Sequence, residues 1–320
     1  MWCFLKINFL KRINQKLGAF LSEEFPFVAA LPALIWQIIF SIVPFVAMFV
    51  YSIIGTDKTN NILGLFTFDF YLELINYAHL KSIYNAIILS IGTIIGCLVF
   101  CFIAAYTITF YIRKKYQPLC VILMMLPLWT NFIVRIYSWF FLLDKRGILS
   151  AALCKAKIIE RSTLLLFNNW VTIVGMVYCY YPFVLLPLYV TMSSIQDELL
   201  EASADLGANG WQTLKFLIIP YCMSEIVASA GLIGLMAFGE FAIPQLLGGS
   251  RYSFWGSIIV SKFIMLRDFK SGAAYTFLGV AVVLALFCLL YIFVKLIKKG
   301  NAHKYKIKNI LLNRAEERPW

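Results

Sequence analysis

Long apolar runs, separated by short charged or turn-forming stretches, dominate the pattern along this chain. Six runs reach the roughly 20 residues that a helix needs to cross a bilayer. The pattern therefore predicts an all-α fold class, a polytopic membrane protein with six transmembrane helices and both termini on one side. The predicted spans cover about 28–54, 82–112, 118–142, 170–194, 224–246 and 271–297.

Composition supports the membrane assignment. Of the 320 residues, 62% are hydrophobic and only 14% are charged, whereas soluble proteins average about half apolar and a quarter charged. A water-soluble fold cannot hide that much apolar surface. The first apolar run is also too long for the core of a signal peptide, so we expect it to remain as a membrane anchor.

The spans divide the chain into three segments. Residues 28–297 form the six-helix membrane domain, which includes a long loop at 195–222, and residues 298–320 form a basic tail. In the preceding segment, 1–27, apolar positions recur at helical spacing between basic residues. This spacing fits a helix lying on the inner membrane surface, and a frayed tail explains it equally well.

The net charge of +12 raises the question of nucleic acid as a partner. The basic residues sit at the ends of apolar runs, as Arg113, Lys114 and Lys115 do, where they meet lipid headgroups. We therefore expect membrane lipid and no nucleic acid. On the side of the termini 16 Lys and Arg residues gather, against 11 on the other side, which predicts cytoplasmic termini.

Sequence motifs for catalysis and metal binding are missing. Cys97 and Cys101 lie four residues apart, as a ligand pair would, but ordinary packing is the expected role. His79 and His303 are the only histidines and lie outside the predicted spans, which disfavours a membrane-embedded enzyme. The sequence also has no Gly-x-x-x-x-Gly-Lys-Ser/Thr phosphate cradle. We expect no metal, no cofactor and no catalytic residues.

The loop between the fourth and fifth predicted spans reads as helix, turn, helix. Ser194 or Asp197 can cap the first helix, and Gly207 can adopt the left-handed conformation that ends it. Asn209 can cap the second helix, and Pro220 closes it before the next span. This local chemistry predicts a rigid elbow, which we define as residues 195–222.

One face of the first elbow helix is acidic. Glu198, Glu201 and Asp205 fall at spacings of three and four, beside the small residues Ala202 and Ser203. A basic or polar groove on another protein would match this face. A plain solvated helix in a long loop is the alternative.

The elbow also resembles the Glu-Ala-Ala loop of binding-protein-dependent ABC importer permeases. The matching residues are Glu201-Ala202-Ser203, then Gly207 after three residues, then Leu217-Ile218-Ile219-Pro220 after nine more. Ser203 replaces the usual Ala, and Leu217 and Ile219 replace the usual Ile and Leu. The resemblance implies a type I ABC importer permease fold and coupling helices that dock into a cleft on a cytoplasmic ABC ATPase dimer. The implied coupling residues are Glu198, Glu201, Ala202, Ser203, Asp205, Gly207 and Pro220.

Flanking motifs resemble the spermidine/putrescine permease branch of that family. The resemblance implies a second homologous permease subunit, an extracytoplasmic solute-binding protein and a place in the bacterial cytoplasmic membrane. Permeases for ferric iron, sulfate or phosphonates share parts of the pattern, so these cargoes stay open. The motifs lie at 126–139, 181–189, 205–207 and 239–249.

Polyamines are flexible polycations, so a path for them should offer carboxylates and aromatic faces. Glu240 lies in an apolar run near the outer end of the fifth predicted span, and Arg135 in the third is its obvious ion-pair partner. Pairing between the two, contact with cargo or gating, and snorkelling at the interface are the three interpretations of Glu240. Aromatic residues that can line the path, or anchor spans at the interface instead, are Trp129, Tyr137, Trp139, Tyr181 and Tyr189.

A secondary transporter driven by an ion gradient is the main rival, because it also needs kinked helices and an intramembrane carboxylate. Such a carrier has no reason to present a capped acidic helix pair to the cytoplasm, so the elbow favours the ATP-driven importer. In the first outer loop, Asp57, Asp69 and Glu73 can contact a solute-binding protein, although a solvated loop is the expected role.

Overall fold

The computed structural model describes residues 25–56, 62–66, 71, 76–156, 165–249 and 253–289. It falls into two units, residues 1–70 with 269–274 and residues 71–268 with 275–320, which are described separately below. Several predictions lie outside the described residues. They concern the surface helix before residue 25, the basic tail 298–320 and the loop acids Asp57, Asp69 and Glu73.

The first unit contains the first membrane span. Helix α2 (Phe25–Gln37) runs through a π-helical turn, η1 (Ile38–Ile42), into α3 (Val43–Ile53), and residues 31–53 are long and apolar enough to cross a membrane. The π-turn ends two residues before Pro44, which has no N–H to donate to an ordinary helical bond. The widened turn therefore lets the helix continue past the proline.

A short hairpin follows the first span. Strand β1 (Ile54–Thr56) pairs antiparallel with β2 (Ile62–Phe66), with Ile54 opposite Phe66 and Thr56 opposite Ile62. Strands were not expected from the sequence. The rest of the described secondary structure is helical, so the all-α prediction holds apart from this hairpin.

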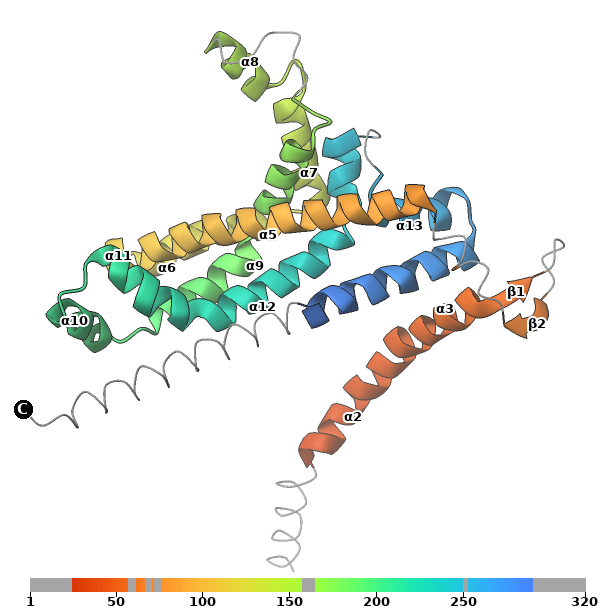
Figure 1. The fold of residues 1–320 in the computed structure, drawn as a ribbon, viewed down its shortest axis with the longest axis horizontal. Coiled ribbons are helices and arrows are strands. Elements are labelled where there is room, and N and C mark those ends of the chain that lie inside the picture. Colours follow the sequence, from red (N-terminus) through yellow and green to blue (C-terminus); the bar gives the residue numbers. More distant parts are fainter. Residues whose placement is uncertain are drawn as a thin grey trace, which may run out of the picture. The chain divides into compact units, whose positions relative to one another are not determined.

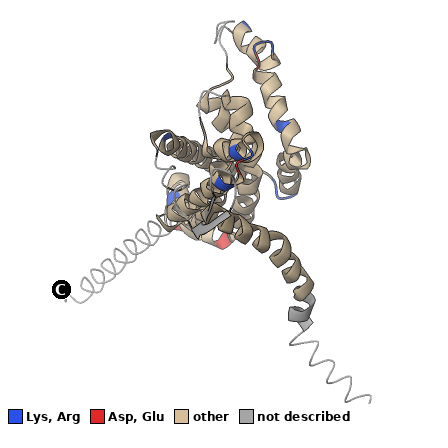
Figure 2. Cartoon of the chain, turned by 90° about the vertical axis from the view of Figure 1, so that its right-hand side faces the viewer, with Lys and Arg blue, Asp and Glu red and all other residues tan. Residues whose placement is uncertain are grey.

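The second unit is built around three long helices, α5 (Tyr77–Tyr111), α9 (Asn169–Ser193) and α12 (Ile219–Phe238), which pack against one another (Figure 1). Figure 2 shows uncharged residues along most of each described helix. The remaining elements are α6 (Gln117–Trp129), α7 (Phe132–Leu143), α8 (Ile148–Lys155), α10 (Asp197–Asp205), α11 (Gly210–Thr213), η2 (Leu214–Ile218), η3 (Pro244–Gly248), α13 (Trp255–Val260) and η5 (Ser261–Met265).

The core of this unit lies along the seam between α5 and α9. On α5, the small residues Thr93, Cys97, Cys101 and Ala105 recur every fourth position and are fully buried. Small side chains let two membrane helices approach closely, which maximises dispersion contacts. The Cys101 thiol donates to the carbonyl of Tyr181 on α9 at 3.2 Å. Both cysteines therefore pack within the seam between α5 and α9, which is the role expected for them.

The third predicted span is broken, which the hydropathy pattern did not predict. Helix α6 ends at Trp129 and α7 begins at Phe132, and the two segments meet at an angle of 92°. Local capping explains the break. The Thr130 hydroxyl donates to the carbonyl of Pro127 at 2.7 Å, and the Asn131 side chain accepts from the backbone N–H of Ile133 at 2.9 Å. Each helix end is thus satisfied by a side chain instead of by the next turn.

The fifth span is also placed differently from the prediction of 224–246. One apolar helix runs from Gly210 to Phe238, and the chain breaks at Gly239 before a short helical segment that includes η3. A last apolar helix, Phe269–Leu289, follows α13 and η5. Five described helices can cross a membrane, or six if the bent α6–α7 pair counts as one span, so the predicted number of spans agrees with the structure.

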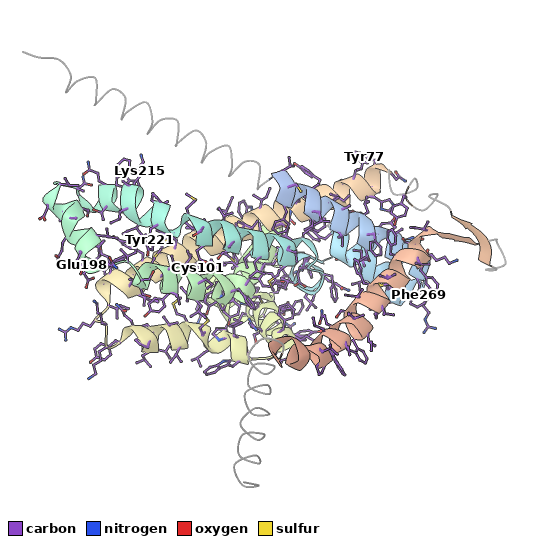
Figure 3. All side chains as sticks on the ribbon, turned by 90° about the horizontal axis from the view of Figure 1, so that it is seen from below. Tyr77, Cys101, Glu198, Lys215, Tyr221 and Phe269 are labelled. Atoms are coloured by element: carbon purple, nitrogen blue, oxygen red, sulfur yellow. The ribbon has the colours of Figure 1, made fainter. Side chains whose placement is uncertain are left out.

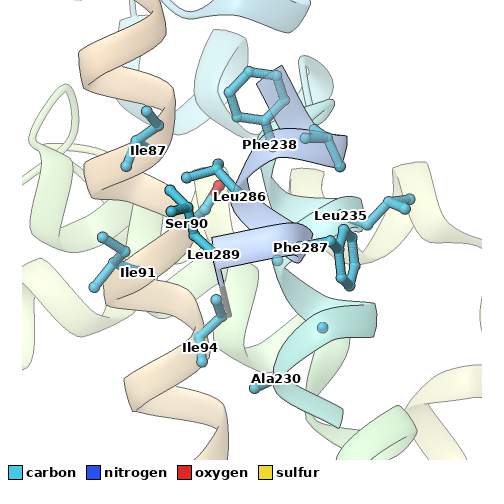
Figure 4. A pocket seen from close by; sticks show the side chains of 13 residues that line it. Ile87, Ser90, Ile91, Ile94, Ala230, Leu235, Phe238, Leu286, Phe287 and Leu289 are labelled. Carbon is cyan, nitrogen blue, oxygen red and sulfur yellow. The ribbon is translucent and has the colours of Figure 1, made fainter. Parts of the chain in front are cut away.

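An apolar groove of about 490 Å³ lies where α5, α12 and the last helix meet (Figure 4). Its lining includes Ala230, Gly231 and Gly234 of α12, and Ser90 is its one hydroxyl-bearing lining residue. Such a lining suits hydrocarbon and offers no charged group to a polar solute.

Candidate functional site: the elbow and the helix break at Glu240

The predicted elbow forms at one end of the second unit, where α10 and α11 meet (Figure 1). Glu198 and Lys215 lie at this end, and Tyr77, at the start of α5, lies at the other (Figure 3). The elbow and the Lys114 region therefore share one face of the membrane domain, as the topology requires: the Lys114 ammonium lies 3.0 Å from the Asp197 carboxylate.

The turn of the elbow is fixed by two capping motifs. Gly207 has φ of +76°, and the amides of Gly207 and Ala208 donate to the carbonyls of Ala204 and Ser203, which is the Schellman arrangement. Asn209 then caps α11. The Asn209 side chain accepts from the backbone N–H of Gln212, and the Gln212 side chain accepts from the backbone N–H of Asn209, both at 2.9 Å. The predictions for Gly207 and Asn209 are confirmed.

The predicted cap of the first elbow helix was wrong. Gln196 stands at the N-cap of α10 with no side-chain hydrogen bond. Ser194 is still the helical C-cap of α9, and its hydroxyl donates to the Thr191 carbonyl at 2.8 Å. Asp197 is already the first residue of α10, where it pairs with Lys114. Neither side chain has the extended backbone before the helix that an N-cap requires.

Pro220 does not close the elbow, which corrects a second prediction. It lies in the first turn of α12, and η2 precedes it. There the Ile219 amide donates to the Leu214 carbonyl five residues back, so a π-turn absorbs the proline. Helix Gly210–Phe238 is therefore continuous from the elbow into the membrane, about 43 Å at 1.5 Å per residue.

The acidic face of the elbow points outward. Glu198, Glu201 and Asp205 are exposed, and their side chains make no ion pair or hydrogen bond to any residue that the structure describes. Large apolar side chains accompany them: Leu206 is 88% exposed and Trp211 is 69% exposed. The sequence pattern had not singled out these two. Exposed apolar groups next to unpaired charges are typical of a surface that another protein covers.

Glu240 sits at the break after α12, not inside a continuous helix. One carboxylate oxygen accepts from the backbone amides of Phe241 at 3.0 Å and Ala242 at 2.8 Å, so Glu240 caps the next helical segment. The other oxygen accepts from the hydroxyl of Tyr180. Because Tyr180 lies near the middle of α9, Glu240 is level with the middle of that span and not near its end.

Another segment packs tightly on the break. A Cβ added at Gly256, in α13, would lie 2.6 Å from the Gly239 carbonyl oxygen and 2.8 Å from that of Glu240. Only glycine allows this approach of two backbones. The Glu240 side chain itself remains partly exposed.

The expected ion pair between Arg135 and Glu240 does not form. Arg135 is 7% exposed and donates to the carbonyls of Cys179 at 3.2 Å and Thr130 at 3.4 Å. The broken third span explains this result, because it frees the Thr130 carbonyl and turns Arg135 toward the backbone of α9. Arg135 and Glu240 therefore contact consecutive residues of α9, Cys179 and Tyr180. Each charged group is hydrogen-bonded to uncharged groups and not to the other.

The predicted aromatic residues differ in exposure and in contacts. Trp129 is 76% exposed and Tyr137 is 43% exposed. The Trp139 ring packs edge-on against the Tyr178 ring, with 5.4 Å between the ring centroids. The Tyr181 and Tyr189 hydroxyls bond the Met124 carbonyl and the Gln117 side chain on α6, which are helix-to-helix bonds. A role of the first three in a path stays a prediction.

Sequence reasoning missed Tyr180, the hydroxyl that reaches Glu240. No local sequence signal distinguishes Tyr180 from Tyr181. The direction in which each side chain points depends on how α9 is rotated about its axis against the neighbouring helices.

Comparison with known proteins places this arrangement in a family. Residues 92–302 match the family described as binding-protein-dependent transport system inner membrane component. The spermidine/putrescine transport system permease protein PotB of Haemophilus influenzae is 34% identical over 260 residues, 80% of this chain and 89% of that protein. The protein of the same name from Escherichia coli is 30% identical over 259 residues, 80% of this chain and 92% of that protein.

Solved structures share the fold. A bacterial ABC transporter that imports the acidic polysaccharide alginate superposes with a TM-score of 0.68 at 16% identity, over 87% of this chain and 98% of that chain. The same kind of transporter in complex with an alginate-bound periplasmic protein gives 0.67 at 17% identity, over 86% and 96%. The chain thus belongs to the inner membrane components of binding-protein-dependent transport systems and has the fold of an ABC importer permease.

Proposed function

We propose that this chain is the transmembrane permease subunit of an ATP-driven importer for polyamines such as putrescine and spermidine. It forms part of the path through the membrane, has no ATP site of its own, and takes its energy from a separate cytoplasmic ATPase dimer. The observation that carries the mechanism is the capped, exposed and acidic elbow, which continues as one helix into the membrane.

The elbow supplies the coupling in this proposal. Unpaired carboxylates of α10 and the exposed Trp211 meet a groove on the ATPase, and Gly207 and Asn209 keep the turn rigid. Because Gly210–Phe238 is continuous, a movement of the elbow is transmitted along the helix axis to Glu240 at its far end. ATP must therefore shift the balance between two states of this helix through contacts that differ in those states.

Glu240 supports the choice of a cationic cargo. Its carboxylate accepts only neutral donors, and no Lys or Arg that the structure describes lies within ion-pair distance. A carboxylate inside a membrane domain without a cationic partner attracts a cation. The relatives named as spermidine/putrescine permeases support the same cargo.

The remaining partners follow from the family. We propose that a second homologous permease completes the membrane assembly and that an extracytoplasmic solute-binding protein delivers the cargo. Both termini face the cytoplasm, on the side of the elbow.

Uptake in reconstituted vesicles tests the proposal. The permease pair, the ATPase and a polyamine-loaded binding protein are combined, and labelled putrescine or spermidine is followed with and without ATP. We expect uptake only when the ATPase and ATP are both present. Uptake that needs no ATPase, driven by an ion gradient, would overturn the mechanism, and uptake of sulfate, phosphonate or ferric iron in place of polyamines would overturn the cargo.

A further inference from the structure

The hydrogen bonds of Glu240 leave a defined part of its carboxylate free. A carboxylate offers about four acceptor positions. Two are taken on one oxygen by the amides of Phe241 and Ala242, and one on the other oxygen by the Tyr180 hydroxyl. One position remains, on the oxygen that Tyr180 contacts, and the side chain is partly exposed.

The two kinds of donor restrain the Glu240 carboxylate in different ways. The backbone amides directly follow Glu240 in the chain, so they fix the carboxylate relative to its own segment and not relative to the other helices. The Tyr180 hydroxyl comes from α9, and the residue is 4% exposed, so it fixes the carboxylate relative to a neighbouring span. Removing that hydroxyl leaves the cap intact but frees the second oxygen to turn.

The same turn of α9 is held from another direction. Arg135 donates to the carbonyl of Cys179, the residue before Tyr180, at 3.2 Å. A buried charged donor on a helix carbonyl restrains that turn, because breaking the bond would leave the buried guanidinium with one hydrogen bond fewer. Arg135 thus steadies the backbone from which Tyr180 reaches Glu240.

We propose that Tyr180 is a positioning residue for cargo recognition: its hydroxyl aims the Glu240 carboxylate so that the remaining acceptor position faces a passing ammonium group. This inference rests on the proposed function, because it needs a cationic cargo. Tyr180 itself need not touch the cargo. A single free acceptor position suits one ammonium at a time, which is what a linear polyamine presents as it moves through.

The neighbouring Tyr181 provides a matched control. It lies on the same turn, is 7% exposed, and its hydroxyl bonds the Met124 carbonyl on α6 and not a carboxylate. Tyr180→Phe and Tyr181→Phe each remove one buried, hydrogen-bonded hydroxyl. They differ in whether that hydroxyl reaches Glu240.

The measurement is the number of spermidine molecules taken up per ATP hydrolysed, in vesicles with saturating loaded binding protein. A hydrogen bond to a charged group corresponds to about a tenfold effect or more, so we expect Tyr180→Phe to lower uptake per ATP about tenfold with the ATPase rate unchanged. Tyr181→Phe should lower uptake and ATPase rate together, through stability, or neither. In a Glu240→Gln background, Tyr180→Phe should add no further loss.

Equal effects of the two tyrosine variants, or a Tyr180→Phe loss that persists in the Glu240→Gln background, would contradict the inference. If Tyr180→Phe does not assemble, Glu240→Asp serves instead: it keeps the charge but shortens the reach to Tyr180, and wild-type uptake per ATP in this variant would also contradict the inference. Absence of ATP-dependent spermidine uptake by the wild-type complex would reject the proposed function itself, which is a separate outcome.

Discussion

The carboxylates of the elbow and the carboxylate at the helix break differ in their hydrogen bonding. At the elbow, Glu198, Glu201 and Asp205 face outward without a hydrogen-bond partner among the described residues, and short local motifs set their positions. At the break, Glu240 accepts three hydrogen bonds from two different parts of the fold. In the proposed mechanism, the elbow leaves its charges free for the ATPase, whereas Glu240 is held in place to meet an ammonium group of the cargo.

The largest expected effect comes from reversing the charge on the elbow. Glu201→Lys places a cation where the proposal needs an anion, and truncating or opposing a buried charge contact at an interface costs about 2–5 kcal/mol. We expect the ATPase to co-purify poorly and uptake to fall to background. Co-purification and ATP-dependent uptake measure this. Gln196→Lys, a change at the exposed N-cap of α10 and outside its acidic face, is the control, and loss in both variants alike would remove the special role of Glu201.

Neutralising the carboxylate at the break should have the next largest effect. Glu240→Gln keeps the size of the side chain and loses its charge, so we expect uptake to fall about 10- to 100-fold, the range for one charge-assisted hydrogen bond. Assembly with the ATPase should be unchanged, as judged by gel filtration. Glu225→Gln, in the same α12 helix, should transport normally. Normal uptake by Glu240→Gln would take this residue off the path.

Arg135 tests how far the turn of α9 that it contacts contributes to transport. Arg135→Gln loses bonds to the Cys179 and Thr130 carbonyls, each worth about 1–3 kcal/mol when a charged group is involved. We expect a lower melting temperature and, because Arg135 steadies the turn that carries Tyr180, a fall in uptake per ATP that is smaller than that of Tyr180→Phe. A fall in uptake per ATP at an unchanged melting temperature would instead show that Arg135 acts on the cargo path.

The smallest effect is expected at the turn of the elbow. Asn209→Ala removes the α11 cap, which should cost about 1 kcal/mol locally. Amide hydrogen exchange should become faster in residues 197–213 and remain the same in α5. Gln196→Ala removes the N-cap side chain that makes no capping bond, so it should change exchange little. Equal acceleration in both variants would mean that capping does not stabilise the elbow.

The sequence predicted the roles of Gly207 and Asn209 at the elbow turn because short-range rules govern them. A glycine after an acidic helix and an Asn three residues before Gln212 determine their own hydrogen bonds, whatever the rest of the fold does. Ser194 and Pro220 were misassigned where a neighbouring element competed: α9 kept Ser194 helical, and a π-turn carried α12 past Pro220.

The helix breaks were missed for a different reason. Hydropathy reports how apolar a stretch is, not whether its helix is continuous, so the runs through Thr130 and Gly239 read as single spans. Pro127 followed by Thr130 and Asn131 was a capping signal that was available. The partners of Glu240 and Arg135 depended on these breaks and on the rotation of α9, and nothing in the sequence alone specified them.

Photo-crosslinking tests the central claim most directly. A crosslinking amino acid replaces Ala202, on the acidic elbow helix, or Tyr77, at the opposite end of the second unit (Figure 3), and the complex is illuminated in the membrane. The account predicts that position 202 crosslinks to the cytoplasmic ATPase, with a yield that changes when ATP binds, and that position 77 does not. A crosslink from position 202 to an extracytoplasmic protein, or none to the ATPase in a complex that still hydrolyses ATP and transports, would contradict it.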